Sequence, residues 1–445
     1  MNTLRNTFKE ILRYPSAIAG GAVILLLIAV SIYAVITIPY NDAIRLWRGG
    51  EDVWFDSPKF APPSWINLFL SKKEPVSFAV NTANGTMSKT VTAGAQNTST
   101  INMSYSFDFQ YDEYPQEVSI YFTSKYVKKQ PFASVQWVTP DGRKIRIDDI
   151  ALDPQRTLRF SQDQRLIQRL NGEDPMKALF EDPKTHAILK GKYQVQILGV
   201  TFEQGSDINA EFVLYGQVAG LAGTDQNRRD LMVALLWGAP IALAFGLLAS
   251  IGTLVLTMII AAIGTWYGGW MDDLIQRITE INLVLPQLAI LIMVGTFYSH
   301  SIWAILGVTI LLNIFTGGIK SYRAIFVQVK ESMYIEAARA YGASNKRIIF
   351  LYLIPRMIPL LIPGLVSSVP SFVFLESTLA VLGLGDPVLP TWGKIIDDAF
   401  SNGALYKGYY YWILEPAALL MITGLGFSLL GFALDRIFNP RLRDI

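Results

Sequence analysis

Two long stretches of the chain carry no charged side chain. No Asp, Glu, Lys or Arg occurs between Asp230 and Asp272, or between Glu280 and Lys320. Roughly 20 consecutive apolar residues cross the hydrocarbon core of a bilayer as a helix, because only helices and closed barrels satisfy every backbone polar group in lipid. The whole chain is only 17% charged, against about a quarter for soluble domains. An integral membrane protein is therefore predicted, rather than a soluble one with apolar core helices.

Composition removes several classes of function. A net charge of +2 gives no electrostatic support for nucleic-acid binding. The absence of cysteine excludes disulfides, thiol catalysis and thiolate metal ligands, and the two histidines, His186 and His300, are far apart in sequence. No G-x-x-x-x-G-K-[ST] phosphate loop occurs. We therefore expect no catalytic residue, no metal site and no ATP site in this chain.

The N-terminal segment is predicted to contain the first span. It begins with Arg5, Lys9 and Arg13 and is then uncharged up to Asp42. A secretory signal is the alternative, but the apolar run is too long and no small-x-small cleavage site follows it. A basic flank of this kind places the N-terminus in the cytoplasm. Residues 1–66 are thus expected to form a cytoplasmic N-terminus and one transmembrane helix.

Residues 67–222 are predicted to form a mainly β domain, of sandwich type. "SYSFDFQ", "KYQVQILGVTF" and "INAEFVLYG" alternate apolar and polar residues as strands do, "TPDG" is a turn signal, and residues 163–190 read as short helix and loop. With one span before it and the N-terminus inside, this domain is expected to be extracytoplasmic. Its three sequons are candidate glycosylation sites: Asn84, Asn97 and Asn102.

Five further spans are expected in residues 223–445, so the predicted fold is an all-α polytopic membrane protein with six transmembrane helices and an inserted β domain. Six spans place residues 320–356 and the C-terminal tail in the cytoplasm, and both are rich in Lys and Arg, as the positive-inside rule requires. The five spans are expected at Trp237–Tyr267, twice within 281–318 with a hairpin near His300, from beyond Arg356 to about Glu376, and at Trp412–Leu434.

The stretch "EAARAYGASNKRIIF" within residues 320–356 has the features of a docking element. Helix formers extend to Tyr341, Gly342 suits the left-handed residue that ends a helix, and Ser344 is a favourable N-cap for a second helix leading into the fifth span. The surrounding cations favour an acidic or polar partner, whereas an ordinary connector, the alternative, needs none of these features. Three small side chains would allow close approach of another surface: Ala337, Ala338 and Ala340.

The same stretch resembles the signature of the binding-protein-dependent ABC permease subunits. That signature is Glu-Ala-Ala, three residues, Gly and, about nine residues later, an apolar residue before Pro, here Ile354-Pro355. The resemblance implies that the helix around Glu336 is a coupling helix seated in a cleft of a separate ATPase subunit. The residues that it assigns to ATPase coupling are Tyr334, Ile335, Glu336, Ala337, Ala338, Gly342 and Ala343.

The resemblance is strong over Gly223–Ile445 and weak over Met1–Ser64. "GTDQNRRD" looks like the pre-span segment of the oligopeptide/dipeptide branch, with Arg228 in place of a glycine, and "ESTLAVLGLGDPVLPTWGKII" and "LLGFALDRIFNPRLRD" resemble its later motifs. Relatives commonly pass from "PPSW"-like residues to GTD within a few positions, whereas here the whole β domain intervenes. The resemblance implies a type I ABC importer permease fold, with a five-helix core in residues 223–445 and an inserted domain of unassigned role.

Two acidic residues outside residues 320–356 are further candidates for function. Asp225 is either a functional residue or the N-cap of the following helix, with Arg228 and Arg229 reaching lipid headgroups. Glu376 lies near the outer end of a predicted span, where an ionisable residue suggests function, or it snorkels to the interface. No substrate-binding residue is predicted.

The resemblance implies a permease subunit that forms half of the translocation pathway of an ATP-driven importer for di- or oligopeptides. The implied partners are a second homologous permease subunit, two ATPase subunits that bind ATP and Mg, an extracytoplasmic solute-binding protein and the lipid bilayer of a prokaryotic inner or plasma membrane. The chain itself needs no cofactor. Nickel or another small solute is an alternative substrate, and a membrane enzyme or an anchored sensor or adhesion protein is an alternative function.

Overall fold

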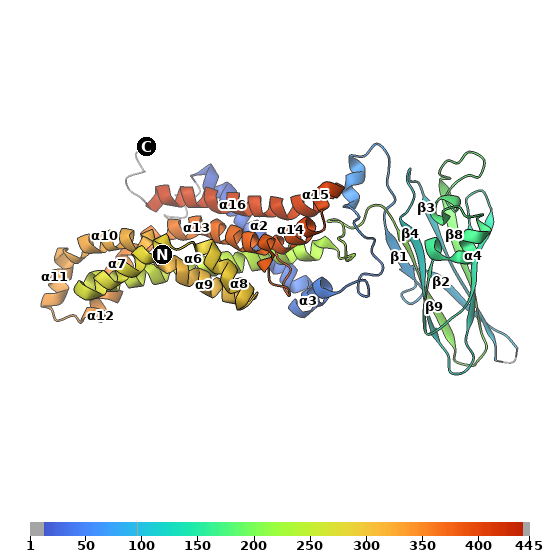
Figure 1. Cartoon of the computed structure of the whole chain (residues 1–445), viewed down its shortest axis with the longest axis horizontal. Coiled ribbons are helices and arrows are strands. Elements are labelled where there is room, and N and C mark those ends of the chain that lie inside the picture. The colour runs from blue at the N-terminus through green and yellow to red at the C-terminus, as the bar shows by residue number, and fades with distance from the viewer. Residues whose placement is uncertain (1–12, 96, 439–445) are drawn as a thin grey trace. The chain divides into compact units, whose positions relative to one another are not determined.

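The computed structural model describes residues 13–95 and 97–438, which fall into two compact units (Figure 1). One, the β unit, is Gly49–Met232, and the other, the helical unit, is formed by the segments before and after it. The basic residues Arg5 and Lys9 lie outside the described residues, as does the end of the C-terminal motif from Asn439 onward.

The β unit is larger than the segment 67–222 because the chain entering it pairs with the chain leaving it. Thr224 N donates to Ala61 O at 2.8 Å, and Phe60 N donates to Asp225 O at 3.2 Å. Residues 49–66 and 223–232 are therefore part of the β unit in the structure. The assignment of 67–222 to the extracytoplasmic side stays a prediction.

Two antiparallel sheets form the β unit. The alternating pattern of the sequence appears as strands with one buried and one exposed face, and "TPDG" forms the expected turn, with Gly142 at φ 85°. One sheet has the order β1 (Phe78–Asn81), β9 (Asp207–Tyr215), β4 (Glu117–Lys125), β7 (Gln155–Arg159), and the other β2 (Ser88–Ala93), β3 (Ser99–Phe109), β8 (Gly191–Thr201), β5 (Phe132–Val138), β6 (Lys144–Ala151).

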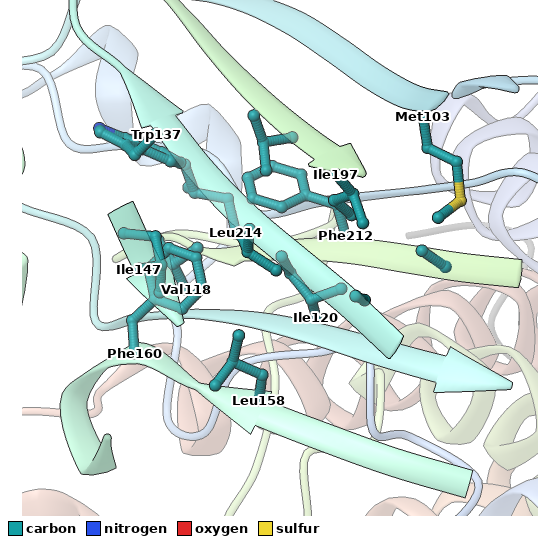
Figure 2. Close-up of a cluster of buried hydrophobic side chains, with 14 of the residues drawn as sticks. Met103, Val118, Ile120, Trp137, Ile147, Leu158, Phe160, Ile197, Phe212 and Leu214 are labelled. Atoms are coloured by element: carbon teal, nitrogen blue, oxygen red, sulfur yellow. The ribbon is translucent and has the colours of Figure 1, made fainter. Parts of the chain in front are cut away.

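The inward faces of the two sheets share one apolar core (Figure 2). Trp137 of β5 is fully buried, and its ring lies 6.3 Å from that of Phe212 on the opposite sheet. Two short helices, α4 (Gln164–Arg169) and α5 (Pro175–Ala178), occupy the segment expected to be short helix and loop. The predicted mainly β domain is thus confirmed, with side chains of both sheets interdigitating as in a sandwich.

The helical unit is that of a multi-pass membrane protein, which confirms the predicted fold class. Among the described residues, four helices are long and apolar enough to cross a bilayer, and the number rises to six if each of two bent helix pairs is one span. Its helices are α2 (Pro15–Thr37), α3 (Tyr40–Arg48), α6 (Leu231–Tyr267), α7 (Gly269–Val284), α8 (Gln287–Phe297), α9 (Ile302–Ile314), α10 (Gly317–Lys330), α11 (Met333–Ala340), α12 (Asn345–Ile348), α13 (Ile354–Leu379), α14 (Trp392–Ser401), α15 (Ala404–Lys407) and α16 (Tyr411–Phe438).

The third and fourth spans differ from the expectation that both lie within 281–318. The apolar helices α8 and α9 have only 11 and 13 residues, and they continue at angles of 81° and 48° into α7 and α10. Pro286 lacks the backbone donor that would continue the first pair as one helix. Asn282 Nδ2 donates to the carbonyls of Leu312 and Phe315, both at 2.8 Å, and so satisfies backbone groups left open at the second break.

The long helices approach one another closely over small residues. α16 packs against both α2 and α13. A Cβ added to Gly20 of α2 would lie 2.6 Å from Gly426 O of α16, and one added to Gly424 would lie 2.6 Å from the Phe374 ring of α13. Small side chains at such crossings allow the backbones to approach within van der Waals contact, which drives helix association in lipid.

The buried Trp137 yields a test of the β unit. Replacing Trp137 by Ala removes a fully enclosed ring, so we expect a loss of about 3–5 kcal/mol in the free energy of unfolding of this unit. Pulse proteolysis of the purified chain in urea measures the change. Phe132→Ala, on the outward face of the same strand, is the matched control; an equal loss in both variants would contradict a core centred on Trp137.

Candidate functional site

The coupling segment, residues 317–353, contains the helix break that the sequence predicts. Helix α11 ends in a Schellman motif, in which Ala343 N donates to Ala338 O at 3.0 Å and Gly342 N donates to Arg339 O at 2.9 Å. Gly342 has φ 77°, a left-handed conformation that costs other residues about 1–2 kcal/mol. The role predicted for Gly342 as the residue that ends the helix is thus confirmed.

The helix that follows the break also begins where predicted. Ser344 has extended backbone angles, and its Oγ accepts a hydrogen bond from Arg347 N at 3.4 Å. From Asn345 the backbone stays helical through α12 and a π-helical turn, Ile349–Leu353, into α13. The break at Gly342 is therefore followed by one continuous helical path up to Leu379.

Helix α11 has one buried and one exposed face. Ile335 is fully buried and Ala338 is 9% exposed, and Ile335 packs in a cluster formed by α6, α10, α12 and α13. Ala343 packs against the same cluster. On the other face Met333 is 86% exposed and Tyr341 92% exposed, and the same surface includes three of the predicted coupling residues: Tyr334, Glu336 and Ala337.

The seven residues assigned to coupling thus divide between two surfaces. Ile335, Ala338 and Ala343 contact the helical unit itself, whereas Tyr334, Glu336, Ala337 and Gly342 are exposed. The first group holds α11 in place, and only the second group is placed to meet another protein. The spacing Ile335–Ala338, three residues apart, follows from the helical period that puts both on one face.

Three cations of the coupling segment bind within the chain, so they do not belong to the cationic rim that was expected to face a partner. Lys330 Nζ donates to the carbonyls of Thr265 and Trp266 at 2.9 and 3.0 Å, in the last turn of α6, where a cation also complements the helix dipole. The Arg339 guanidinium lies 4.4 Å from the centre of the Trp266 ring. Lys346 and Arg347 are the exposed cations beyond the break.

A third cation of the segment pairs with α7. Arg323 of α10 donates to both carboxylate oxygens of Asp272, with distances of 2.9, 2.9 and 2.5 Å. Such bidentate geometry fixes the relative orientation of the two side chains. Sequence reasoning did not identify this pair, because the two residues are 51 positions apart; the signal available was the isolated acidic pair "DD" that follows a long uncharged run.

Asp225 is not the N-cap of α6. Asp230 has this position, with Oδ1 accepting from Met232 N at 2.9 Å. Asp225 is fully buried and accepts hydrogen bonds from Asn227 N, Arg229 N and Arg229 Nε at 2.8, 2.9 and 2.5 Å. Burial raises the pKa of the Asp225 carboxyl and outweighs the opposing effect of Arg229.

The two neighbouring arginines are not placed for lipid headgroups as expected. Arg229 is 7% exposed in its pair with Asp225. The Arg228 guanidinium lies 4.9 Å from the centre of the Tyr215 ring and donates to Ser57 O at 2.6 Å. The "GTDQNRRD" turn is therefore a buried polar element of the β unit, and a further functional role for Asp225 stays a prediction.

Glu376 does not snorkel to an interface. Its side chain is 7% exposed in α13 and accepts a hydrogen bond from Ser377 Oγ at 3.3 Å. It lines a cavity of about 10 Å³ together with Asp386, whose carboxylate accepts from Ile302 N at 3.1 Å and from Val388 N at 2.8 Å. Asp386 thus fixes the start of α9 to the loop before α14. A functional role for Glu376 stays a prediction.

The sequons are on the surface of the β unit. Asn84 and Asn97 are exposed in turns, and Asn102 is exposed on β3. Asn84 Oδ1 accepts from Thr86 N and Thr86 Oγ1 at 3.1 and 2.7 Å. Glycosylation at these positions stays a prediction.

Comparison with known proteins places the helical unit in a family. Residues 253–444 match the family model described as "Binding-protein-dependent transport system inner membrane component". The chain is 30% identical over 226 residues to an oligopeptide transport system permease protein of Bacillus subtilis (strain 168), which is 50% of this chain and 72% of the relative. It is 28% identical over 225 residues to a dipeptide transport system permease protein of Alkalihalophilus pseudofirmus, again 50% of this chain and 72% of the relative.

A third relative is a dipeptide transport system permease protein of Bacillus subtilis (strain 168), 28% identical over 222 residues, which is 50% of this chain and 68% of the relative. Each of the three alignments covers only half of this chain. An alignment of that length cannot include both the helical core and the whole β unit. The helix break at Gly342, the exposed face of α11 and these matches all indicate the same family. The chain belongs to the family of binding-protein-dependent transport system inner membrane components, the permease subunits of ABC importers.

Proposed function

We propose that this chain forms half of the translocation pathway of an importer for di- or oligopeptides, and that α11 is the helix through which an ATPase subunit moves it. Permeases of this family are non-enzymatic membrane components that work in an ABC transporter complex, and ATP is bound by the ATPase partners. The single observation that carries the proposal is the exposed face of α11 on a helix whose opposite face is anchored.

The composition of this exposed face supports contact with another protein. Met333 and Tyr341 at its two ends and Tyr334 between them are large apolar or aromatic side chains that are exposed to the extents of 86, 92 and 43%. Neighbouring apolar groups that stay exposed mark interaction sites more often than single ones do, and Tyr and Met are enriched at protein interfaces. Ala337 between them leaves room for close approach.

The anchored face supports a mechanical role. A push on α11 is transmitted to α6 through Arg339 on Trp266 and through Ile335 in the buried cluster. It is transmitted to α13 through the continuous helical backbone that starts at Asn345. Closely packed side chains resist compression, so small displacements at α11 would move both helices rather than be absorbed.

The substrate, partners and topology of the proposal have separate support. Di- or oligopeptides follow from the printed names of the relatives. We infer a second homologous permease subunit, two ATPase subunits and an extracytoplasmic solute-binding protein as partners, in a prokaryotic inner or plasma membrane. The Lys- and Arg-rich segment 320–356 supports a cytoplasmic α11, cytoplasmic termini and an extracytoplasmic β domain in residues 67–222.

Substitution at the helix break tests the coupling role. In Gly342→Trp a bulky side chain stands at the edge of the exposed face, so we expect the assembled transporter to keep ATP hydrolysis while peptide uptake falls by about tenfold or more, a loss of some 1.4 kcal/mol in coupling. Uptake into proteoliposomes and phosphate release are measured together. Gly142→Trp, also at a left-handed glycine with open surroundings but in a β-unit turn, is the control. Normal uptake with Gly342→Trp would contradict the proposal.

The anchor of α11 is tested separately by removing Trp266. We expect Trp266→Ala to accelerate amide hydrogen exchange in residues 333–343 by about tenfold or more, because the Arg339 contact and part of the buried cluster are lost and local opening becomes easier. Mass spectrometry of the exchanged chain gives the rates. Trp270→Ala, whose side chain is 73% exposed in α7, should leave them unchanged; protection of α11 that survives loss of Trp266 would refute the anchor.

The topology is tested by labelling introduced cysteines, since the chain has none of its own. In intact cells a membrane-impermeant maleimide should label Ala95→Cys in the β unit and should label Ala340→Cys in α11 only after the membrane is permeabilised. Both positions are exposed. Labelling of Ala340→Cys from outside would place the coupling segment on the wrong side and remove the proposed function.

A further inference from the structure

The β unit contains a cavity of about 560 Å³ on the outer face of its four-stranded sheet. Its floor is formed by strands β1, β9, β4 and β7, and its walls include Glu51 and Phe55 before the first strand and Arg228 after the last. This volume lies in the range of small-molecule sites, which is about 300–1,000 Å³. Nothing in the family match, which begins at residue 253, assigns a role to it.

The wall of the cavity is held in place by specific contacts. The Phe55 ring meets the Tyr121 ring edge to face with centroids 4.7 Å apart, and Tyr121 Oη donates to Phe55 O at 3.3 Å. Tyr215 Oη also donates to Phe55 O. Arg228 stacks on the Tyr215 ring and donates to Ser57 O. The cavity is therefore preformed by residues that are up to 171 positions apart.

Formal charges in the cavity lining cancel. Three arginines are balanced by three carboxylates, so the lining as a whole favours neither an anion nor a cation. Glu51 already has a partner, because Lys59 forms an ion pair with it. The positively charged lining residues are Arg156, Arg159 and Arg228, and the negatively charged ones are Glu51, Asp52 and Glu211.

Three of these charges, Glu211, Arg159 and Arg228, define a negative and a positive pole. Glu211 on β9 is half-buried, and both burial and the carboxylate of Asp56 raise its pKa; burial also raises the pKa of Asp56. In the described part of the chain neither carboxylate has an ion-pair partner. The positive pole lies near Glu51 and Tyr215, because the charges of Arg159 and Arg228 both interact with these two side chains.

The sheet register gives the separation between the poles. Glu211 of β9 is opposite Tyr121 of β4, which is opposite Thr157 of β7, so Glu211 and Arg159 differ by two strands and two residues. This is about 10 Å across the strands and about 7 Å along them. Two hydroxyl side chains of the lining, Tyr121 and Thr157, lie between the poles in this register. Further neutral hydrogen-bonding side chains line the cavity on the side of Glu211 away from Arg159: Asn81, Thr123 and Asn209.

We propose that this cavity binds an extended zwitterion, a small molecule with a cationic end at Glu211, an anionic end at Arg159 and Arg228, and hydrogen-bonding groups between them. Half-buried carboxylates are costly without a partner, and a ligand ammonium group supplies one. A guanidinium binds a ligand carboxylate with two parallel hydrogen bonds. The site belongs to the β unit alone and does not depend on the importer function proposed above.

Calorimetric titration of the purified full-length chain in detergent tests this, with trialanine as the probe and no ATPase or solute-binding protein present. We expect one binding event per chain. N-acetyl-trialanine, which lacks the cationic end, and trialanine amide, which lacks the anionic end, should each bind about tenfold or more weakly, because each leaves one pole without a partner. Absence of trialanine binding, or equal binding of a blocked peptide, overturns the proposal.

Variants locate the site and assign its poles. Glu211→Gln should lower the affinity for trialanine about tenfold or more but leave the affinity for N-acetyl-trialanine unchanged. Arg159→Gln should lower the affinity for trialanine but leave the affinity for trialanine amide unchanged. In each case the blocked peptide lacks the group that the altered residue would bind, as in a double-mutant cycle. Arg146→Gln, on the outer face of the other sheet, is the matched control and should bind like the unaltered chain. Equal trialanine affinity in Glu211→Gln, or loss in Arg146→Gln, places binding elsewhere and overturns the proposal. The unchanged blocked-peptide affinities exclude misfolding as the cause.

Discussion

Close packing over small residues is the constraint on which the helical unit depends. Lipid tails are as apolar as the helix surfaces, so burying one apolar helix face against another gains little, and contact must come from backbone approach. Gly20 against Gly426 joins α2 to α16, and Gly424 under Phe374 joins α16 to α13. Apolar packing of this kind is not directional, so polar contacts are needed to orient the helix ends. Lys330 on the last carbonyls of α6 and Arg323 on Asp272 provide them at one end of the unit.

The β unit is stabilised differently, because the hydrophobic effect drives the burial of its apolar core. Its two ends lie side by side: Thr224 N donates to Ala61 O, and Ala61 N donates to Thr224 Oγ1 at 3.1 Å. An inserted domain whose ends are adjacent can be added to a loop, or left out of it, without moving the elements on either side. In this chain strands β1–β9 lie between Ala61 and Thr224, so the whole β sandwich starts and ends at this one point.

Local chemistry was readable from the sequence, and long-range pairing was not. The break at Gly342, the restart at Ser344 and the alternation of β8 are set by residues within a few positions, so they could be predicted. The uncharged runs predicted spans, but at the bend after α9 Asn282 donates to carbonyls 30 and 33 residues away, a contact that no local pattern reveals. Likewise, Arg229 looked like an interfacial residue until its burial against Asp225 was known. The cavity of the β unit needs the sheet register, which no single strand reveals.

The helix that continues from the coupling segment has an interrupted hydrogen-bond ladder, and it is held to its neighbour by direct contacts. Helix α13 contains Pro359, Pro363 and Pro370 and begins after a π-helical turn; each proline removes one backbone donor. Ser250 Oγ of α6 donates to Leu365 O at 2.8 Å in the middle of this stretch, and Gly246 of α6 allows Val369 and Val373 to approach. The two helices that α11 contacts at their ends are thus joined to each other along their length. In the proposed mechanism a displacement of α11 would move α6 and α13 together, because bending α13 alone would break its contacts with α6.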